Sequence, residues 1–201
     1  MKKRVFLFPA AVFLGTACLL SGCGKKSAAG DAGEVYVYNW GEYIDEDVIT
    51  MFEEETGIKV VYDMFETNEE MYPVIEAGGV NYDVICPSDY MIQKMIENDL
   101  LAELNFDNIP NISEINPEFM ERSKAFDPEN KYSVPYTWGT VGILYNTSMV
   151  APEDVPTKWA DLWDEKFKGE ILMQDSVRDA FMVALKSLGY SMNTTNESEL
   201  K

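Results

Sequence analysis

Apolar and polar positions beyond residue 33 follow the patterns of short strands and helices in alternation. Strands are predicted where β-branched and aromatic residues cluster, at 34–38, 58–64 and 82–86, the last with the composition of a buried strand. Helices are predicted from an Asp45 N-cap to residue 55, at 68–77, and from a Ser88 N-cap to residue 98. Pro73 predicts a late start or a kink in the second helix. This alternation predicts a parallel sheet with helices packed against it.

The rest of the sequence is richer in loops but continues the pattern. Strands are predicted at 132–135, 140–145 and 170–173, and a short helix at 159–163. A helix that opens at Asp175 and Ser176 then carries an apolar stripe at helical spacing. Thr195 or Asn196 resembles the cap of another helix, yet the sequence stops at Lys201. This stop predicts a truncated gene product or fragment.

The N-terminal residues have the layout of a bacterial lipoprotein signal peptide. A basic start at residues 2–4 precedes an apolar run, 5–20, that is shorter than the roughly 20 residues a spanning helix needs. Leu20-Ser21-Gly22-Cys23 resembles a lipobox, in which the Cys thiol is acylated and the chain is cut before it. We predict a signal peptide at 1–22, a lipid on Cys23 and a flexible tether at 23–33. A coincidental Cys after an ordinary signal peptide is the alternative.

Charge and residue usage narrow the possible functions. The sequence has 16 Lys and Arg against 35 Asp and Glu, a formal net charge of −19, which argues against nucleic acid and anionic membrane surfaces as partners. The charge suits a cationic ligand, although solubility alone would explain it.

Histidine is absent, which removes the usual general base, the usual zinc ligand and the Ser-His-Asp triad. With Cys18 cleaved off and Cys23 lipidated, only Cys86 remains, so we expect no internal disulfide. We also expect no metal site and no cofactor.

Candidate binding residues lie where predicted strands end, since ligands of parallel α/β sheets bind at the carboxyl ends of the strands. A cation is bound by carboxylates and by aromatic faces, the latter worth about 0.5–2 kcal/mol. Three groups offer these: Trp40, Glu42 and Tyr43; Ser88, Asp89 and Tyr90; and Asp175, Ser176 and Asp179.

Each of these residues also has a plainer interpretation. Trp40 and Tyr43 could pack hydrophobically, and Ser88 and Asp175 could serve only as helix caps. Asp179 could be a first-turn carboxylate favoured by the helix dipole, and the Glu42 side chain could simply be solvated. Helix N-termini at the same places would suit an anion, whereas the acidic side chains favour a cation.

A series of stretches carries a resemblance to one family. They are Val35-Tyr-Val-Tyr-Asn-Trp40, Glu53-Glu-Glu-Thr-Gly-Ile-Lys-Val60, Asn68-Glu-Glu-Met-Tyr72, Tyr82-Asp-Val-Ile-Cys-Pro-Ser88, Lys131-Tyr-Ser-Val-Pro-Tyr-Thr-Trp-Gly139, Trp159-Ala-Asp-Leu-Trp163, and Ala184-Leu-Lys-Ser-Leu-Gly-Tyr190 with Asn193-Thr-Thr195. In this order they resemble the spermidine/putrescine-binding proteins of polyamine ABC transporters. The resemblance covers nearly all of residues 34–201.

The resemblance implies an α/β fold of the two-lobed periplasmic-binding-protein type (type 2), incomplete at the C-terminus. Residues 34–140 would form the first lobe, without its returning C-terminal segment. Residues 141–201 would form the crossover strand and the beginning of the second lobe. Family members are considerably longer, so we predict weak or no polyamine binding by residues 1–201 alone.

The resemblance also assigns the site. Trp40, Glu42 and Tyr43 would line it from the first lobe, with Ser88 and Tyr90 opposite the amine chain. In the second lobe the family places two carboxylates on the turn 174–179. Asp179 fills one place, whereas Ser176 occupies the other without a charge, and Asp175 is the candidate substitute. This departure leaves the preference between spermidine and putrescine open.

The function implied is capture of a polyamine outside the cytoplasmic membrane, closure, and delivery to an ABC permease, with no chemistry performed. The protein would be a monomer anchored through the lipid on Cys23, on the periplasmic or extracellular face of that membrane. The same fold serving another small cation or an anion is a close alternative. A cell-surface hydrolase that uses a pair of carboxylates is the alternative from a different class, and a surface adhesin is a third.

Overall fold

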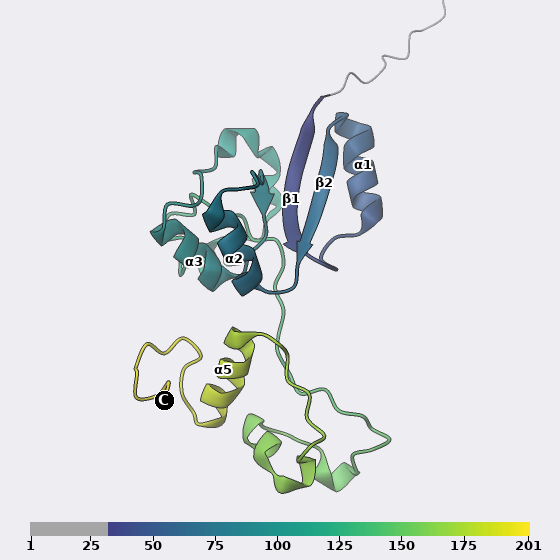
Figure 1. Cartoon of the computed structure of the whole chain (residues 1–201), viewed down its shortest axis with the longest axis vertical. Helices are drawn as coiled ribbons and strands as arrows, with labels where there is room; N and C mark the ends of the chain where they lie inside the picture. The colour runs from purple at the N-terminus through teal and green to yellow at the C-terminus, as the bar shows by residue number, and fades with distance from the viewer. Residues whose placement is uncertain (1–31) are drawn as a thin grey trace, which may run out of the picture.

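The computed structural model describes residues 32–201, so the predicted signal peptide and Cys23 lie outside the described residues. A parallel sheet of three strands forms the centre of the N-terminal half (Figure 1). β1 (Glu34–Trp40) lies between β2 (Lys59–Phe65) and β3 (Val84–Ile85). β1 and β2 pair in parallel from their first residues to their last, whereas β3 adds only two residue pairs. The predicted α/β fold with a parallel sheet is confirmed.

Three helices connect and follow these strands: α1 (Glu46–Thr56), α2 (Asn68–Ala77) and α3 (Asp89–Glu97). The Asp45 side chain caps α1 as predicted, because it accepts a hydrogen bond from the Asp47 amide at 2.9 Å. Gly57, with φ of 74°, ends α1 in the left-handed conformation that glycine adopts most easily. Pro73 lies inside α2, which begins at Asn68, so the helix does not start late.

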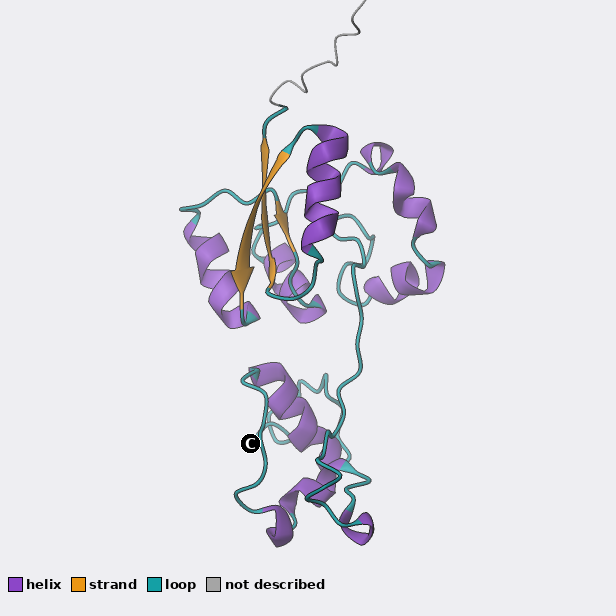
Figure 2. Ribbon diagram, turned by 90° about the vertical axis from the view of Figure 1, so that its right-hand side faces the viewer, coloured by secondary structure: helices purple, strands orange, loops and turns teal. Residues whose placement is uncertain are grey.

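The hydrophobic core lies between the sheet and helices α2 and α3. It consists of the buried side chains Tyr38, Phe65, Met71, Tyr72, Met91 and Met95. The rings of Tyr38 and Phe65 meet edge to face, with centroids 5.0 Å apart. Helix α1, beside β2, has no buried residue, and Val48 and Phe52 of its apolar stripe are largely exposed (Figures 1 and 2). The core is therefore one-sided.

A loop-rich segment, 101–135, follows the sheet. It contains the short helices η1 (Phe106–Asn108), η2 (Pro110–Glu114) and α4 (Pro117–Ser123). Asp127, 1% exposed, organises its end, since its carboxylate accepts hydrogen bonds from the amides of Lys131, Tyr132 and Ser133 at 2.9–3.0 Å. The buried carboxylate thereby fixes the path of the chain toward the second half.

The C-terminal half is built from short turns and one longer helix (Figure 1). It contains η3 (Pro152–Asp154), η4 (Trp159–Trp163), η5 (Glu165–Phe167) and α5 (Val177–Ser187). We call residues 32–135 the sheet region and residues 146–201 the α5 region, with 136–145 as the segment between them. The predicted short helix at 159–163 is present as η4.

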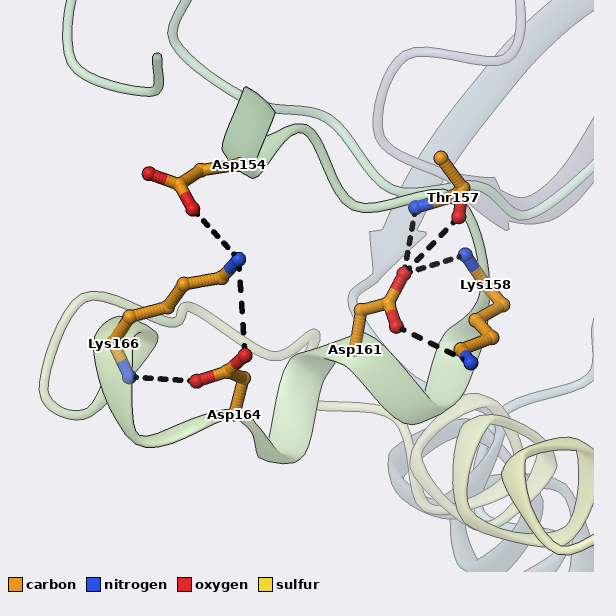
Figure 3. Close-up of polar contacts among 6 residues, drawn as sticks. All are labelled: Asp154, Thr157, Lys158, Asp161, Asp164 and Lys166. Carbon is orange, nitrogen blue, oxygen red and sulfur yellow. Dashed lines mark hydrogen bonds and ion pairs between the residues drawn. The ribbon is translucent and has the colours of Figure 1, made fainter. Parts of the chain in front are cut away.

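Exposed polar contacts join the short helices of the α5 region, as Figure 3 shows. Asp161 accepts hydrogen bonds from the amides of Thr157 at 2.8 Å and Lys158 at 3.1 Å. The Lys166 ammonium lies 2.9 Å from the Asp154 carboxylate and 3.7 Å from that of Asp164. These bonds lower the pKa of Asp161 and raise the pKa of Lys166. Both shifts mean that the contacts stabilise the charged forms of the two side chains.

Several predicted strands do not form. Residues 132–135, 140–145 and 170–173 belong to no strand, and the predicted strand at 82–86 shrinks to Val84 and Ile85. Leu144 is 98% exposed, Leu172 is 99% exposed, and Val84, on an edge strand, is 52% exposed. A strand needs a neighbour for its backbone hydrogen bonds. The described chain offers none beside 132–135, 140–145 and 170–173, whereas residues 83–86 have β1 on one side only.

The last predicted helix does not form either. Asn196 accepts a hydrogen bond from the Ser198 amide at 3.0 Å, as a cap would, but only a turn follows it. Within residues 32–201, no helix has both the length and the apolar character needed to cross a membrane.

Candidate functional site

The loop after β1 carries the first group of candidate residues and is held at both ends. Asn39 is buried, and its side-chain oxygen accepts a hydrogen bond from the Trp40 amide at 2.8 Å. Tyr62 donates its hydroxyl proton to the Trp40 carbonyl at 3.2 Å, and the Tyr136 hydroxyl donates to the Tyr43 carbonyl. Tyr136 lies in the segment that leads to the α5 region. The loop is therefore tied to the connection between the two halves.

The aromatic residues of this loop present ring faces at its surface. Trp40 packs its ring against Phe65, with centroids 4.8 Å apart, and stacks on Tyr43 at 5.7 Å. Trp40 is half-buried, and Tyr43 remains 48% exposed. The packing interpretation is therefore correct in part, because the same rings also leave area open for a ligand. Glu42, between them, is exposed and has no hydrogen bond or ion pair with any other residue of the described chain.

Asn68 organises the second group of candidates, Ser88 and Tyr90. Its amide nitrogen donates to Ser88 Oγ and to the Tyr90 hydroxyl, both at 2.9 Å, and its oxygen accepts from the Ser88 amide at 3.0 Å. Ser88 occupies the N-cap position of α3, but its side chain makes no capping hydrogen bond. The predicted N-cap position is confirmed, but the Ser88 hydroxyl accepts a hydrogen bond from Asn68 instead of capping the helix.

Tyr90 is polarised by a neighbouring carboxylate. Its hydroxyl donates to Glu69 Oε1 at 3.0 Å. Burial, followed by the charge and hydrogen bond of Glu69, raises the pKa of Tyr90 to about 12, although the Asn68 hydrogen bond and the Arg178 charge oppose the shift. Tyr90 therefore stays neutral at physiological pH and offers an electron-rich ring beside an acidic side chain.

The third group lies at the start of α5. Ser176 is the N-cap, and its hydroxyl accepts from the Asp179 amide at 3.4 Å. The carboxylates of Asp175 and Asp179 have no partner among residues 32–201. This turn lies beside the second group, because the guanidinium carbon of Arg178 lies 5.1 Å from the centroid of the Tyr90 ring. No side-chain contact in the described chain joins either group to Glu42.

The arrangement of these side chains suits the binding of an organic cation rather than metal binding or nucleophilic catalysis. Three unpaired carboxylates (Glu42, Asp175 and Asp179) accompany exposed aromatic faces. In the described part of the chain, no group of His, Cys, Asp and Glu has the geometry to hold a metal ion. Burial raises the pKa of the Cys86 thiol to about 11, so this thiol stays protonated at neutral pH.

A separate cavity lies in the α5 region. It has a volume of about 600 Å³ and is lined in part by Ile143, Lys158, Trp159 and Lys186. None of the predicted site residues lines it, and its lysines do not suit a cationic ligand. The unpaired carboxylates and the aromatic contacts lie instead in the strand-end loops and at the start of α5.

Sequence reasoning missed the residues that support these groups: Asn39, Asn68, Glu69, Tyr136 and Arg178. A polar residue directly at a strand end or a helix start was the available signal for Asn39 and Asn68. Tyr136 and Arg178 act across long separations in sequence, and no local pattern identifies their partners.

Comparisons with known proteins identify families and structures that this chain resembles. The sequence profile of the family "Bacterial extracellular solute-binding protein" matches residues 81–200. The spermidine/putrescine-binding periplasmic protein of Escherichia coli K12 is 40% identical over 175 residues, which cover 86% of this chain and 49% of that protein. A putrescine-binding periplasmic protein of Pseudomonas aeruginosa is 36% identical over 182 residues, which cover 86% of this chain and 50% of that protein.

Solved structures with a similar fold are also proteins of this kind. The substrate-binding protein of a spermidine/putrescine ABC transporter from Streptococcus pneumoniae is 46% identical, with a TM-score of 0.68 over 84% of this chain and 51% of that one. A lipoprotein of Treponema pallidum is 34% identical, with a TM-score of 0.76 over 83% of this chain and 51% of that one. The chain thus spans about half the length of the curated relatives it matches.

Proposed function

Because the chain belongs to the bacterial extracellular solute-binding proteins, we propose that it serves as the polyamine-binding component of an ABC uptake system. Spermidine or putrescine is the ligand, and no chemistry is performed on it. Two observations carry the proposal: the carboxylates of Glu42, Asp175 and Asp179 have no partner among residues 32–201, and each lies within a few residues in sequence of a residue in a ring contact, Trp40 with Tyr43 or Arg178 with Tyr90. The names of the relatives point to the same ligand class.

In the proposed mechanism, each ammonium of the ligand exchanges its bound water for contacts with an aromatic face and a carboxylate. Trp40 and Tyr43 supply faces beside Glu42, while Tyr90 supplies a face opposite Asp175 and Asp179. Asn39, Tyr62 and Asn68 hold the backbone and hydroxyl groups in place, so little side-chain entropy is lost on binding. Residues 34–140 would act as a first lobe and residues 141–201 as the start of a second, approaching each other around the ligand.

We further propose that a lipid on Cys23 and the tether 23–33 keep the site near the membrane, where the loaded protein meets its permease. The sequence of residues 20–23 and the relative from Treponema pallidum, described as a lipoprotein, support this anchor. Membrane fractionation of a Cys23→Ser variant tests it, since the variant should leave the membrane fraction.

Binding by the chain itself should be weak. Tyr43 is 48% exposed, and Glu42 and Asp175 are exposed as well, so water screens their attraction for an ammonium. We expect millimolar rather than micromolar dissociation constants for spermidine. A micromolar value by calorimetry would contradict this expectation.

Nuclear magnetic resonance is the suitable measurement, because it detects weak binding at individual residues. Spermidine and putrescine should shift the Trp40 indole and Tyr90 ring signals, whereas phosphate should not. Trp40→Ala and Asp179→Asn should each weaken binding about two- to fivefold. Glu54→Gln, which removes an exposed carboxylate from α1, is the matched control and should change nothing. Shifts caused by phosphate alone would refute the polyamine proposal.

A further inference from the structure

Arg178 places a cation of the protein itself on one of the candidate aromatic faces. Its guanidinium carbon lies 5.1 Å from the Tyr90 ring centroid, within the range of a cation–π contact. Its Nη2 atom donates a hydrogen bond to Asn193 Oδ1 at 2.7 Å, which fixes the direction of the side chain. Arg178 forms no ion pair with any carboxylate of residues 32–201, although Asp175 and Asp179 are close in sequence.

The Tyr90 ring has its polar end occupied. The hydroxyl donates to Glu69 and accepts from Asn68, so the ring offers a ligand its π face rather than its oxygen. A guanidinium over that face uses the same electrostatic attraction that would hold a polyamine ammonium. Two cations on one ring repel each other, so they cannot both use it fully.

We propose that Arg178 is an internal competitor for the site, whose guanidinium must leave the Tyr90 ring before a polyamine ammonium takes its place. Arg178 thereby lowers the affinity of the site for polyamines. It also selects ligands whose cation binds the Tyr90 ring more strongly than the guanidinium does. The inference rests on the proposed function, because it assumes that Tyr90 contacts the ligand. It adds a role for a residue of the α5 region that is neither acidic nor aromatic.

The first measurement needs no ligand. The sequence has three arginines, so the Arg178 side-chain signal can be assigned in a nitrogen–proton spectrum by comparison with an Arg178→Lys variant. The Tyr90 ring should shift this signal, and Tyr90→Leu should abolish the shift. A signal that is the same in both chains would overturn the proposal, because the contact would not exist in solution.

The second measurement is a titration of the full chain with spermidine, in which the Arg178 signal should move toward its position in Tyr90→Leu. Arg178→Gln should bind spermidine about two- to fivefold more tightly than the unaltered chain. Lys186→Gln removes the same charge from the exposed end of α5 and is the control for simple repulsion. Asn193→Ala keeps the charge but releases its anchor, and it should also tighten binding, by a smaller factor.

The outcomes separate this inference from the proposed function. If spermidine binds neither the unaltered chain nor Arg178→Gln, the polyamine function fails and the competition fails with it. If spermidine binds both equally, or binds Arg178→Gln more weakly, the function stands and the competition is wrong. An equal gain in Lys186→Gln would reduce the effect of Arg178 to general charge and would also overturn the proposal.

Discussion

The sheet region and the α5 region are parts of one chain but are stabilised by different interactions. The sheet region has a paired sheet and an apolar core in which Met71 and Met95 are fully buried. The α5 region buries Met182, Val183 and Leu185 of its helix, and exposed ion pairs join its short turns. The predicted strands at 140–145, just before this region, and at 170–173, within it, stay unpaired, and Leu144 and Leu172 are almost wholly exposed.

This difference shows how much a strand depends on its neighbours. Residues 59–65 became a strand because β1 lies beside them, whereas residues 140–145, equally apolar, have no strand alongside. The candidate site lies between these two kinds of structure, with Tyr90 from the sheet region and Arg178 from the α5 region in contact. Under the proposed function, the less well packed half would move as the site closes on its ligand.

Amide hydrogen exchange should show the largest difference between the paired strand β1 and the unpaired segments 140–145 and 171–175. No backbone amide of residues 140–145 or 171–175 donates a hydrogen bond to another described residue. These amides should exchange at nearly the rate of an unfolded peptide, whereas those of β1 should be slowed by several orders of magnitude. Mass spectrometry of exchanged peptides measures both in one experiment. Strong protection of 140–145 would show that these residues are paired in solution.

Truncating the core should have the next largest effect. Met95→Ala removes a side chain with no exposed area and should lower the free energy of unfolding of the sheet region by about 2–5 kcal/mol. Met51→Ala, at a position 66% exposed on α1, is the matched control and should change it by less than about 0.5 kcal/mol. Urea unfolding followed by circular dichroism measures both variants. Similar losses in the two would contradict a one-sided core.

Removing the amide that organises Ser88 and Tyr90 should have a smaller effect. Asn68 is 3% exposed and makes three hydrogen bonds, so Asn68→Ala should cost about 1–3 kcal/mol. It should also broaden the Tyr90 ring signal, since the ring loses a fixed partner. Asn108→Ala, at an exposed position in η1, is the control for both readouts. An unchanged Tyr90 signal in Asn68→Ala would show that α3 alone positions the ring.

Acid should weaken the contacts of Asp161 in the α5 region, with a small effect. The folded state holds the pKa of Asp161 below its ordinary value of 3.8, chiefly through the Thr157 amide. The stability this adds is present above the unfolded pKa and is lost as the pH falls through the lower folded pKa. The Thr157 and Lys158 amide signals should therefore change as the pH falls below about 4, and Asp161→Asn should already show the acid form at pH 7. Equal acid responses in both chains would contradict this role.

The local parts of the fold could be predicted. The Asp45 cap of α1 and the bounds of α2 are set by neighbouring residues, and both were found where the sequence placed them, whereas the cap of α5 is Ser176 and not Asp175. The candidate residues at strand ends also followed from local pattern and from the family resemblance. The strands predicted at 132–135, 140–145 and 170–173 did not form, because a strand depends on a neighbour that local sequence does not identify and the described chain has none beside them.

The sequence by itself determined the α/β class, the positions of the principal helices, the acidic character and the aromatic and carboxylate candidates, since each depends on composition or on residues a few positions apart. The tertiary structure alone decided which of these residues meet. It placed Asn68 between Ser88 and Tyr90, tied Tyr136 to the Trp40 loop, and put the Arg178 guanidinium on the Tyr90 ring. Such contacts depend on how strands and helices are packed in three dimensions, and no periodicity along the chain encodes them.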